Sequence, residues 1–380
     1  MKKKLWTIFF YLNGNNDLGI EMENTFLDII SNNNYEDINV IIQIGKAPIN
    51  LVNLIRQSDF SYKEEWTGVR RYSLIDRILN LEESFDVLNM SNYKALGNFI
   101  EWGTKKFPAE KYMVVISGHG FVATVLSDLC SEKIYTMGLY EMGLALKNLK
   151  KSTKINIDIL TLDVCNLNSM ELLYELGKDK ENIVKNVLTY INSGPLSGMK
   201  FSELIPLFNS DDPNKILKIV ISKSTLNLVA IDINHNKLER IRNLSKSLAS
   251  ETLLYHKDKL ESRKELLDKY HNEINKLSKK LIISHKNTDK SFSLLYFICF
   301  NRDKINDIKY FSELYNKLSF VKSNPCSNLL TLNIDNKLII EPSKPSPIIL
   351  QKENLILYLK LYNPYLNEEK INTIINKIYK

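Results

Sequence analysis

Two reactive side chains each follow a short apolar run, and their types suit nucleophilic chemistry. Residues 112–117 (YMVVIS) lead to His119, and residues 159–163 (ILTLD) lead to Cys165. An apolar, β-branched run bounded by polar and glycine residues is typical of a strand buried on both faces. Open α/β sheets bind ligands at the carboxyl edge of their strands, so the imidazole and the thiol are expected within reach of each other. This pattern predicts a cysteine nucleophile with a histidine base.

Each of these two residues also has an interpretation that needs no catalysis. A lone histidine is often a hydrogen-bonded core residue, and a lone cysteine is often a small buried hydrophobe. The glycines beside His119 favour the catalytic interpretation, because Gly118 and Gly120 let the backbone approach a ligand and the Gly120 N–H could bind an oxyanion. A helix after Cys165 and a nearby histidine would lower the pKa of its thiol. The other four histidines, at positions 235, 256, 271 and 285, lie in polar sequence.

The elements that must position this pair alternate between strand and helix patterns over the first 235 residues. Apolar runs predict buried strands, apolar residues at helical spacing predict the helices between them, and right-handed crossovers join them. The expected strands span residues 5–12, 38–44, 112–117, 159–163, 187–191 and 226–233, and the expected helices span 20–30, 92–106, 139–149, 170–176, 201–209 and 213–222. Residues 51–57 and 69–73 are expected to form a hairpin or two edge strands. Residues 121–134 have no clear periodicity.

The last third of the chain has a different character, which suggests three regions. Residues 1–240 form the expected core, and residues 241–290, rich in Lys, Glu and Asn, form a charged helical segment. Residues 291–380 form an α+β extension packed on the core, with a hairpin over 329–340 and a last strand over 355–361.

Composition narrows the class of protein. The chain has 380 residues, 44% of them hydrophobic, and a net charge of +7 from 51 basic and 44 acidic residues. The basic residues are mostly scattered lysines, which are typical of a solvated surface rather than a nucleic-acid interface. The four cysteines form no CxxC pair, as expected in a reducing compartment. The first apolar run is short and lacks a small-residue cleavage site, so we expect a strand rather than a secretion signal, and a cytoplasmic protein. No run approaches the length of a membrane span.

Several segments, taken in order, resemble the clostripain family of cysteine peptidases, relatives of caspases, gingipains and legumain. Residues 6–18 (WTIFFYLNGNNDL) resemble the family's first strand and turn, and residues 98–112 (NFIEWGTKKFPAEKY), with His119, resemble its helix and histidine strand. Residues 163–176 (DVCNLNSMELLYEL) resemble its nucleophile segment, and residues 228–232 (LVAID) resemble a later core strand. The resemblance covers about residues 5–245 and is faint beyond them, chiefly at residues 355–358.

The resemblance implies a caspase-like α/β/α sandwich with a mostly parallel central sheet, with helical and small α+β additions at the C-terminus. It further implies an endopeptidase in which Cys165 and His119 act through a thioester, with the N–H groups of Gly120 and Cys165 binding the oxyanion. The family cuts after Arg or Lys, and Asp163 matches one acid of its specificity pocket. A carboxylate suits a guanidinium or ammonium. Asp163 could equally cap the following helix.

The match has two departures. Where the family has an acid-rich turn, this chain has residues 192–199 (NSGPLSGM), so Ser193 and Ser197 become the polar side chains of the pocket, with Ser197 in place of a second acid. One charge instead of two weakens the expected basic specificity. In addition, the Gly-Trp pair that usually follows the histidine is absent. A catalytically weak or inactive relative that acts as a binding or regulatory module is therefore the alternative.

Processing and partners complete the expectations. Many relatives are cut between the two catalytic strands, and Lys133 is the expected cut site here, unless residues 127–135 are an ordinary surface loop. The expected partner is a peptide or protein substrate, with neither nucleic acid nor membrane, and a monomer is favoured. No cofactor is expected; the resemblance allows calcium, although no Asp-rich loop argues for it. Phosphate-loop, dinucleotide, GxSxG and zinc patterns are absent.

Overall fold

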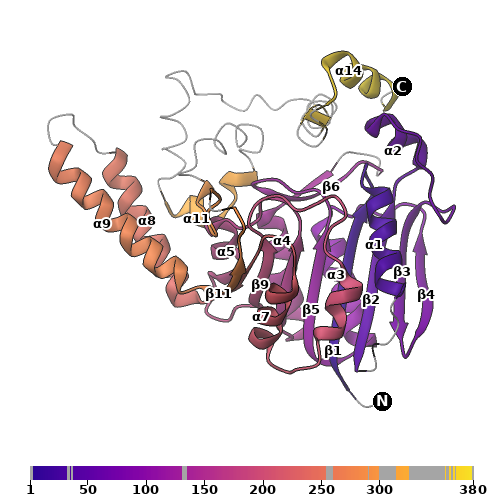
Figure 1. Cartoon of the computed structure of the whole chain (residues 1–380), viewed down its shortest axis with the longest axis horizontal. Helices are drawn as coiled ribbons and strands as arrows, with labels where there is room; N and C mark the ends of the chain where they lie inside the picture. Colours follow the sequence, from indigo (N-terminus) through magenta and orange to yellow (C-terminus); the bar gives the residue numbers. More distant parts are fainter. Residues whose placement is uncertain are drawn as a thin grey trace.

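A large, mostly parallel sheet forms the centre of the molecule (Figure 1). The computed structural model describes residues 3–31, 35, 37–130, 135–253, 260–289, 291–298, 314–324, 356, 359–360, 363 and 365–378. Within them the sheet has nine strands in the order β11-β10-β9-β8-β5-β1-β2-β3-β4. The strands are β1 Lys4–Gly14, β2 Ile38–Lys46, β3 Gly68–Ile75, β4 Ile78–Phe85, β5 Ala109–Ser117, β8 Ile157–Asp163, β9 Val184–Tyr190, β10 Leu228–Asp232 and β11 Ile282–Lys286.

The five middle strands, from β9 to β2, are parallel, and antiparallel strands flank them on both sides. Strand β1 lies inside the sheet, between β5 and β2, and its side chains are apolar on both faces. Phe10 and its alternate neighbours pack on one face, and Phe9 and Tyr11 pack on the other. A strand buried on both faces reads as a continuous apolar run, which is why residues 5–12 were recognisable in the sequence.

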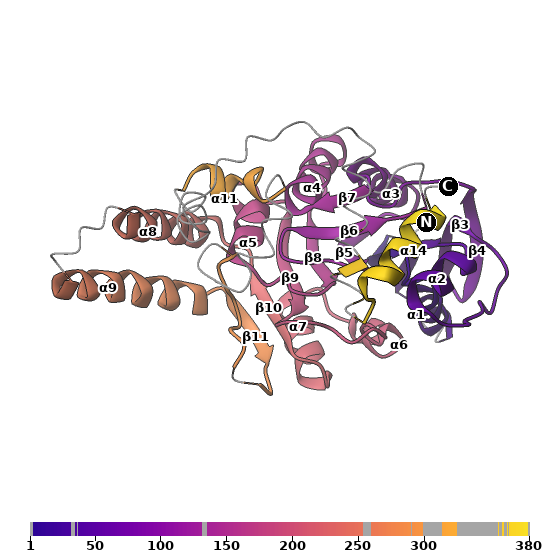
Figure 2. The same cartoon turned by 90° about the horizontal axis from the view of Figure 1, so that it is seen from above.

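Helices cover both faces of the sheet (Figure 2). One face carries α3 Tyr93–Lys106, α4 Leu139–Thr153 and α5 Met170–Gly177, and the other carries α1 Gly19–Ser31, α6 Phe201–Leu204 and α7 Pro213–Lys223. The predicted helix over 201–209 is shorter than expected, because α6 passes into the 3₁₀ turn Ile205–Leu207. Each layer buries its own apolar cluster against the sheet. The result is a three-layer α/β/α sandwich.

One prediction for the first half of the core needs correction, and one unassigned stretch contains a strand. Residues 51–57 are not a strand but helix α2 Ile49–Arg56, which buries Val52 and Ile55 at helical spacing and ends at a left-handed Gln57. Strand β3 pairs instead with β4, whose largely exposed side chains left no alternating pattern to detect. A short apolar run alone does not separate strand from helix. The unassigned residues around 121–134 contain β6 Thr124–Asp128, which pairs with β7 Tyr135–Gly138.

The later part of the chain adds helices and one more strand. Helices α8 His235–Leu253 and α9 Leu260–Lys279 lie side by side and project from one end of the sheet (Figures 1 and 2). Strand β11 follows them and joins the sheet edge within the segment expected to be helical. The proposed division into three regions stays a prediction.

The C-terminal elements that the structure describes are helical. They are α11 Ser319–Lys322, which packs on α5, and α14 Glu368–Ile378, which belongs to an apolar cluster with α2 and Leu129. The expected hairpin over 329–340 lies outside the described residues. The expected strand over 355–361 is wrong at the described positions 356, 359 and 360, which are helical.

Candidate active site

The carboxyl ends of β5 and β8 bring His119 and Cys165 to one cavity. The two strands are parallel neighbours with Ser117 opposite Asp163, so each reactive residue lies two positions beyond its strand. Both side chains line a narrow cavity of about 50 Å³, together with Leu18, Met22, Gly118, Asp163, Val164, Tyr190, Gly194, Pro195, Leu196 and Gly198. The predicted convergence of imidazole and thiol at one sheet edge therefore agrees with the structure.

Gly120 is required by packing. A Cβ built on it would lie 2.0 Å from Val164 Cγ1 and 2.9 Å from the carbonyl oxygen of Thr124. The backbone after His119 therefore packs directly against the residue that precedes Cys165. The role of the Gly120 N–H as an oxyanion donor stays a prediction.

His119 has a carboxylate partner that the sequence analysis did not single out. Its Nε2 lies 3.1 Å from Oδ1 of Asp17, and the two side chains are only 11% and 2% exposed. Asp17 lies in the turn after β1, the strand next to β5, although 102 residues separate it from His119. The sequence showed this segment as a polar turn after a buried strand. The position of Asp17 beyond a strand's carboxyl end was the signal that could have identified it.

Cys165 sits at the start of an irregular loop, which we call the nucleophile loop (residues 164–169). The next residue, Asn166, has a φ of +58°, a left-handed conformation that asparagine tolerates better than most residues. The thiol is half-buried and lies 4.0 Å from the carbonyl oxygen of Gly194. Helix α5 begins only at Met170 and is capped by Ser169, whose hydroxyl accepts a hydrogen bond from the Leu172 N–H. The alternative role of Asp163 as the cap of this helix is therefore wrong.

Asp163 forms a buried acidic floor beside the thiol. Its carboxylate accepts hydrogen bonds from Tyr190 Oη at 2.5 Å and Ser117 Oγ at 2.9 Å. Burial raises the pKa of Asp163 above its usual value, and hydrogen bonds from Tyr190, Ser117 and the Met199 backbone oppose that rise. Gly198 has a φ of +64°, and a Cβ there would lie 2.7 Å from the Asp163 carboxylate. A side chain at this position would therefore collide with the carboxylate, so glycine is required.

Two of the remaining predicted site residues, Ser193 and Ser197, do not line this cavity. Both are exposed on the loop after β9, although their neighbours Gly194, Leu196 and Gly198 line the cavity. Their role in substrate binding stays a prediction. Lys133, the expected cut site, lies outside the described residues.

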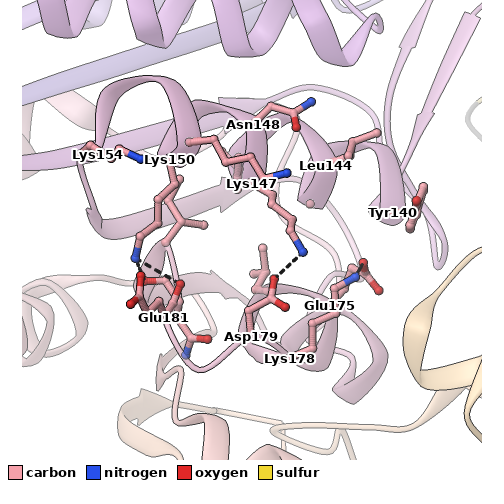
Figure 3. Close-up of a pocket in the computed structure, with 16 residues that line it drawn as sticks. Tyr140, Leu144, Lys147, Asn148, Lys150, Lys154, Glu175, Lys178, Asp179 and Glu181 are labelled. Atoms are coloured by element: carbon pink, nitrogen blue, oxygen red, sulfur yellow. Dashed lines mark hydrogen bonds and ion pairs between the residues drawn. The ribbon is translucent and has the colours of Figure 1, made fainter.

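A larger cavity of about 510 Å³ lies elsewhere, between α4 and residues 175–183 (Figure 3). Its lining is rich in lysines, but Lys147 pairs with Asp179 at 2.9 Å, and Lys150 donates to the Glu181 carbonyl at 3.1 Å. Neither reactive residue lines it. Across the described part of the chain, no group of three or more His, Cys, Asp and Glu side chains could hold a metal ion. No helix there is long and apolar enough to cross a membrane.

Comparison with known proteins identifies the family. The model of the clostripain family matches residues 11–366, which is nearly the whole chain. The chain belongs to the clostripain family. It is therefore a cysteine-type peptidase, a hydrolase that acts on peptide or protein substrates. Among curated protein sequences, none matched.

Solved structures agree with the clostripain assignment at the level of the fold. A secreted C11 cysteine protease from Bacteroides thetaiotaomicron, in complex with an irreversible peptide inhibitor, is 14% identical, with a TM-score of 0.58 over 84% of this chain and 99% of that one. An inactive zymogen C11 protease from Parabacteroides distasonis is also 14% identical, with a TM-score of 0.57 over 85% and 99% of the two chains. The predicted caspase-like fold is confirmed.

Proposed function

We propose that this clostripain-family chain is an endopeptidase in which Cys165 is the nucleophile and His119 is the general base and then the general acid. The observation that supports it most is the convergence of both side chains, from neighbouring parallel strands, on one cavity floored by Asp163. A thiol is a weak nucleophile until an adjacent base removes its proton. The pair supplies both functions.

The reaction then proceeds in two steps. In the first step, His119 accepts the thiol proton and the Cys165 sulfur attacks the carbonyl carbon of the scissile peptide bond. The C–N bond then breaks as His119 returns that proton to the leaving amine. The thioester that remains is attacked by a water molecule, which gives its proton to His119, and the thiolate leaves as the carboxylic acid product forms. Gly120 N–H and Cys165 N–H would stabilise the oxyanion in both steps.

Asp17 would position His119 for this chemistry. Its carboxylate lies 3.1 Å from Nε2, so Nδ1 is the nitrogen through which His119 would exchange a proton with the thiol. A buried carboxylate also favours the imidazolium that forms when the proton is taken.

Asp163 would select a basic residue on the amino side of the scissile bond, the P1 position. A carboxylate offers about four lone-pair sites, so the hydrogen bonds from Tyr190, Ser117 and the Met199 backbone leave about one of them for a P1 ammonium or guanidinium. Among the residues that the structure describes, this is the one carboxylate that lines the cavity, and Ser197 adds no charge. We therefore expect a preference for Lys or Arg that is weaker than a two-acid pocket would give.

A panel of fluorogenic peptides that differ only at P1 tests this proposal. The wild type should cleave peptides with P1 Lys or Arg faster than those with P1 Ala or Glu, and Cys165→Ala should abolish turnover. Asp163→Ala should lose the discrimination between these peptides. If Cys165→Ala hydrolyses these peptides at the wild-type rate, Cys165 is not the nucleophile.

Self-processing near Lys133 and a cytoplasmic location are also part of this proposal. Mass spectrometry of the purified wild type should find a cut after Lys133 that Cys165→Ala lacks. Cleavage that persists in the variant would assign the cut to another protease.

A second candidate is a weakly active protein that works by binding. The dimensions of the site favour it, because about 50 Å³ is far below the 300–1,000 Å³ of typical ligand pockets. Peptide binding to Cys165→Ala without turnover by the wild type would support this candidate.

A further inference from the structure

The nucleophile loop is held from outside by a segment far along the chain, residues 293–298, which we call the strap. The strap runs parallel to the loop, with Tyr296 bridged to Ser169. The Met170 N–H donates to the Tyr296 carbonyl at 2.8 Å, and the Tyr296 N–H donates to the Asn168 carbonyl at 3.3 Å. This contact therefore joins the region expected to be a C-terminal extension to the proposed catalytic loop.

Buried side chains strengthen this contact. The amide nitrogen of Asn168, which is fully buried, donates to the carbonyl of Ile191 beyond β9 at 2.8 Å and to two strap carbonyls, those of Ser293 and Leu294, at 3.2 and 3.0 Å. One side chain thus links the loop, the end of a core strand and the strap.

The hydroxyl of Tyr296 contacts the loop at Asn166, the residue with the left-handed backbone. It donates to the carbonyl oxygen of Asn166 at 2.8 Å, while the Asn166 N–H donates to the carbonyl oxygen of Asn192 at 2.8 Å. Asn166 directly follows Cys165 and has a φ of +58°. Asparagine tolerates this conformation better than most residues, but it still costs more than the right-handed one, so contacts from the surroundings help to hold it. The two hydrogen bonds fix the peptide groups on both sides of this residue.

We propose that Tyr296 is a positioning residue for the nucleophile: its hydroxyl holds the left-handed backbone at Asn166 and thereby sets the direction of the Cys165 thiol and backbone N–H. This inference rests on the proposed function, because it assigns Cys165 the nucleophilic role. Tyr296 reaches the reacting atoms only through the backbone, so it is not itself catalytic.

The hydroxyl can act as a donor throughout the working pH range. Burial raises the pKa of Tyr296 above its usual value, and the nearby carboxylate of Glu171 raises it further. Glu171 is itself fully buried and accepts a hydrogen bond from the Ile298 N–H at 3.0 Å, so it fixes the far end of the strap.

The test is Tyr296→Phe in the full chain, which removes one oxygen atom and keeps the ring. We expect kcat/KM to fall about tenfold, mostly through kcat, because a misdirected nucleophile affects the transition state more than substrate binding. The rate of labelling by an acyloxymethyl-ketone probe should fall by a similar factor. A merely structural role would lower the melting temperature and leave kcat and the labelling rate of the folded protein unchanged.

The matched control is Tyr174→Phe. Tyr174 is also mostly buried, and its hydroxyl donates to Glu239 Oε1 at 2.6 Å, which joins α5 to α8 away from the loop. This variant should lose stability and keep kcat. Wild-type kcat and labelling in Tyr296→Phe would overturn the inference. If Tyr296→Phe does not fold, Asn168→Ala is the second variant, because it removes hydrogen bonds to the strap without altering Tyr296. A wild-type kcat in Asn168→Ala would also overturn the inference.

Failure of the proposed function gives a different result. If the wild type shows neither turnover nor labelling that depends on Cys165, the proposed function and the role of Tyr296 both fail. If the wild type turns over and Tyr296→Phe matches it, only the positioning role fails.

Discussion

The substitution Asp17→Asn removes the charge beside His119 while it keeps the size and shape of the side chain. The carboxylate lies 3.1 Å from the imidazole, and the two side chains are 2% and 11% exposed, so solvent screens the contact little. A hydrogen bond to a charged group contributes about 1.5–3 kcal/mol. At about 1.4 kcal/mol per factor of ten, its loss predicts a fall in kcat/KM of about 10- to 150-fold.

The pH profile distinguishes this mechanism from general damage. An asparagine oxygen can still accept from Nε2, but without a negative charge the imidazolium is less stable. Loss of one negative charge beside the Cys165–His119 pair makes removal of either proton from the pair easier. Both limbs of the bell-shaped kcat/KM profile should therefore move to lower pH. The assay is hydrolysis of a fluorogenic peptide, measured from about pH 4 to 10.

A matched control is Asp158→Asn at the opposite end of β8. Asp158 is buried and accepts from Lys185 Nζ at 2.8 Å and from the Tyr112 N–H at 3.0 Å. Its substitution should lower stability without changing the profile of the folded enzyme. If Asp17→Asn keeps kcat/KM within twofold of the wild type with both limbs unchanged, the assigned role of Asp17 is refuted.

Three further predictions concern the pocket, the glycine after the histidine and a buried ion pair. Burial raises the pKa of Asp163, so its side chain stays protonated and neutral up to a higher pH than that of an ordinary aspartate. For a substrate with P1 lysine, kcat/KM should therefore fall on the acid side as Asp163 becomes neutral. A substrate with P1 alanine should not show this acid limb. Gly120→Ala places a Cβ 2.0 Å from the neighbouring valine side chain and should lower kcat about 100-fold, whereas Gly97→Ala, with nothing nearer than 3.7 Å, should not. Lys46→Met leaves the carboxylate of Glu23, which lies 2.6 Å from Lys46 Nζ, buried without its cation, and urea denaturation should show a loss of about 3–5 kcal/mol in unfolding free energy. Adding Glu23→Gln removes the unpaired charge and keeps an oxygen for the backbone N–H groups of Lys63 and Glu64, so it should restore part of that loss.

Elements buried on both faces were predictable from the amino-acid sequence. The apolar runs that became β1, β5 and β8 are continuous, because both faces of these strands pack against helices, and such runs are visible without a structure. Elements at the rim were not predictable in this way. Helix α2 is short and half-buried, and β4 exposes most of its side chains, so neither carries a period that distinguishes strand from helix.

The sequence by itself determined which reactive side chains reach the candidate site and where in the fold that site lies. A thiol and an imidazole, each two residues beyond a buried parallel strand, must meet at the carboxyl edge of the sheet whenever the two strands are neighbours. Residues 163–176 also carry part of the resemblance to the clostripain family.

Only the tertiary structure decided which groups hold that chemistry in place. Asp17 contacts His119 across 102 residues, and Tyr296 contacts Asn166 across 130. Neither contact leaves a local pattern, because a side-chain hydrogen bond depends on the positions of two distant backbones and not on the spacing of residues within either segment. For the same reason, the sequence does not reveal that Tyr190 and Ser117 donate hydrogen bonds to Asp163. The reactive atoms were therefore readable from the sequence, whereas their orientation depends on the packing of the whole chain.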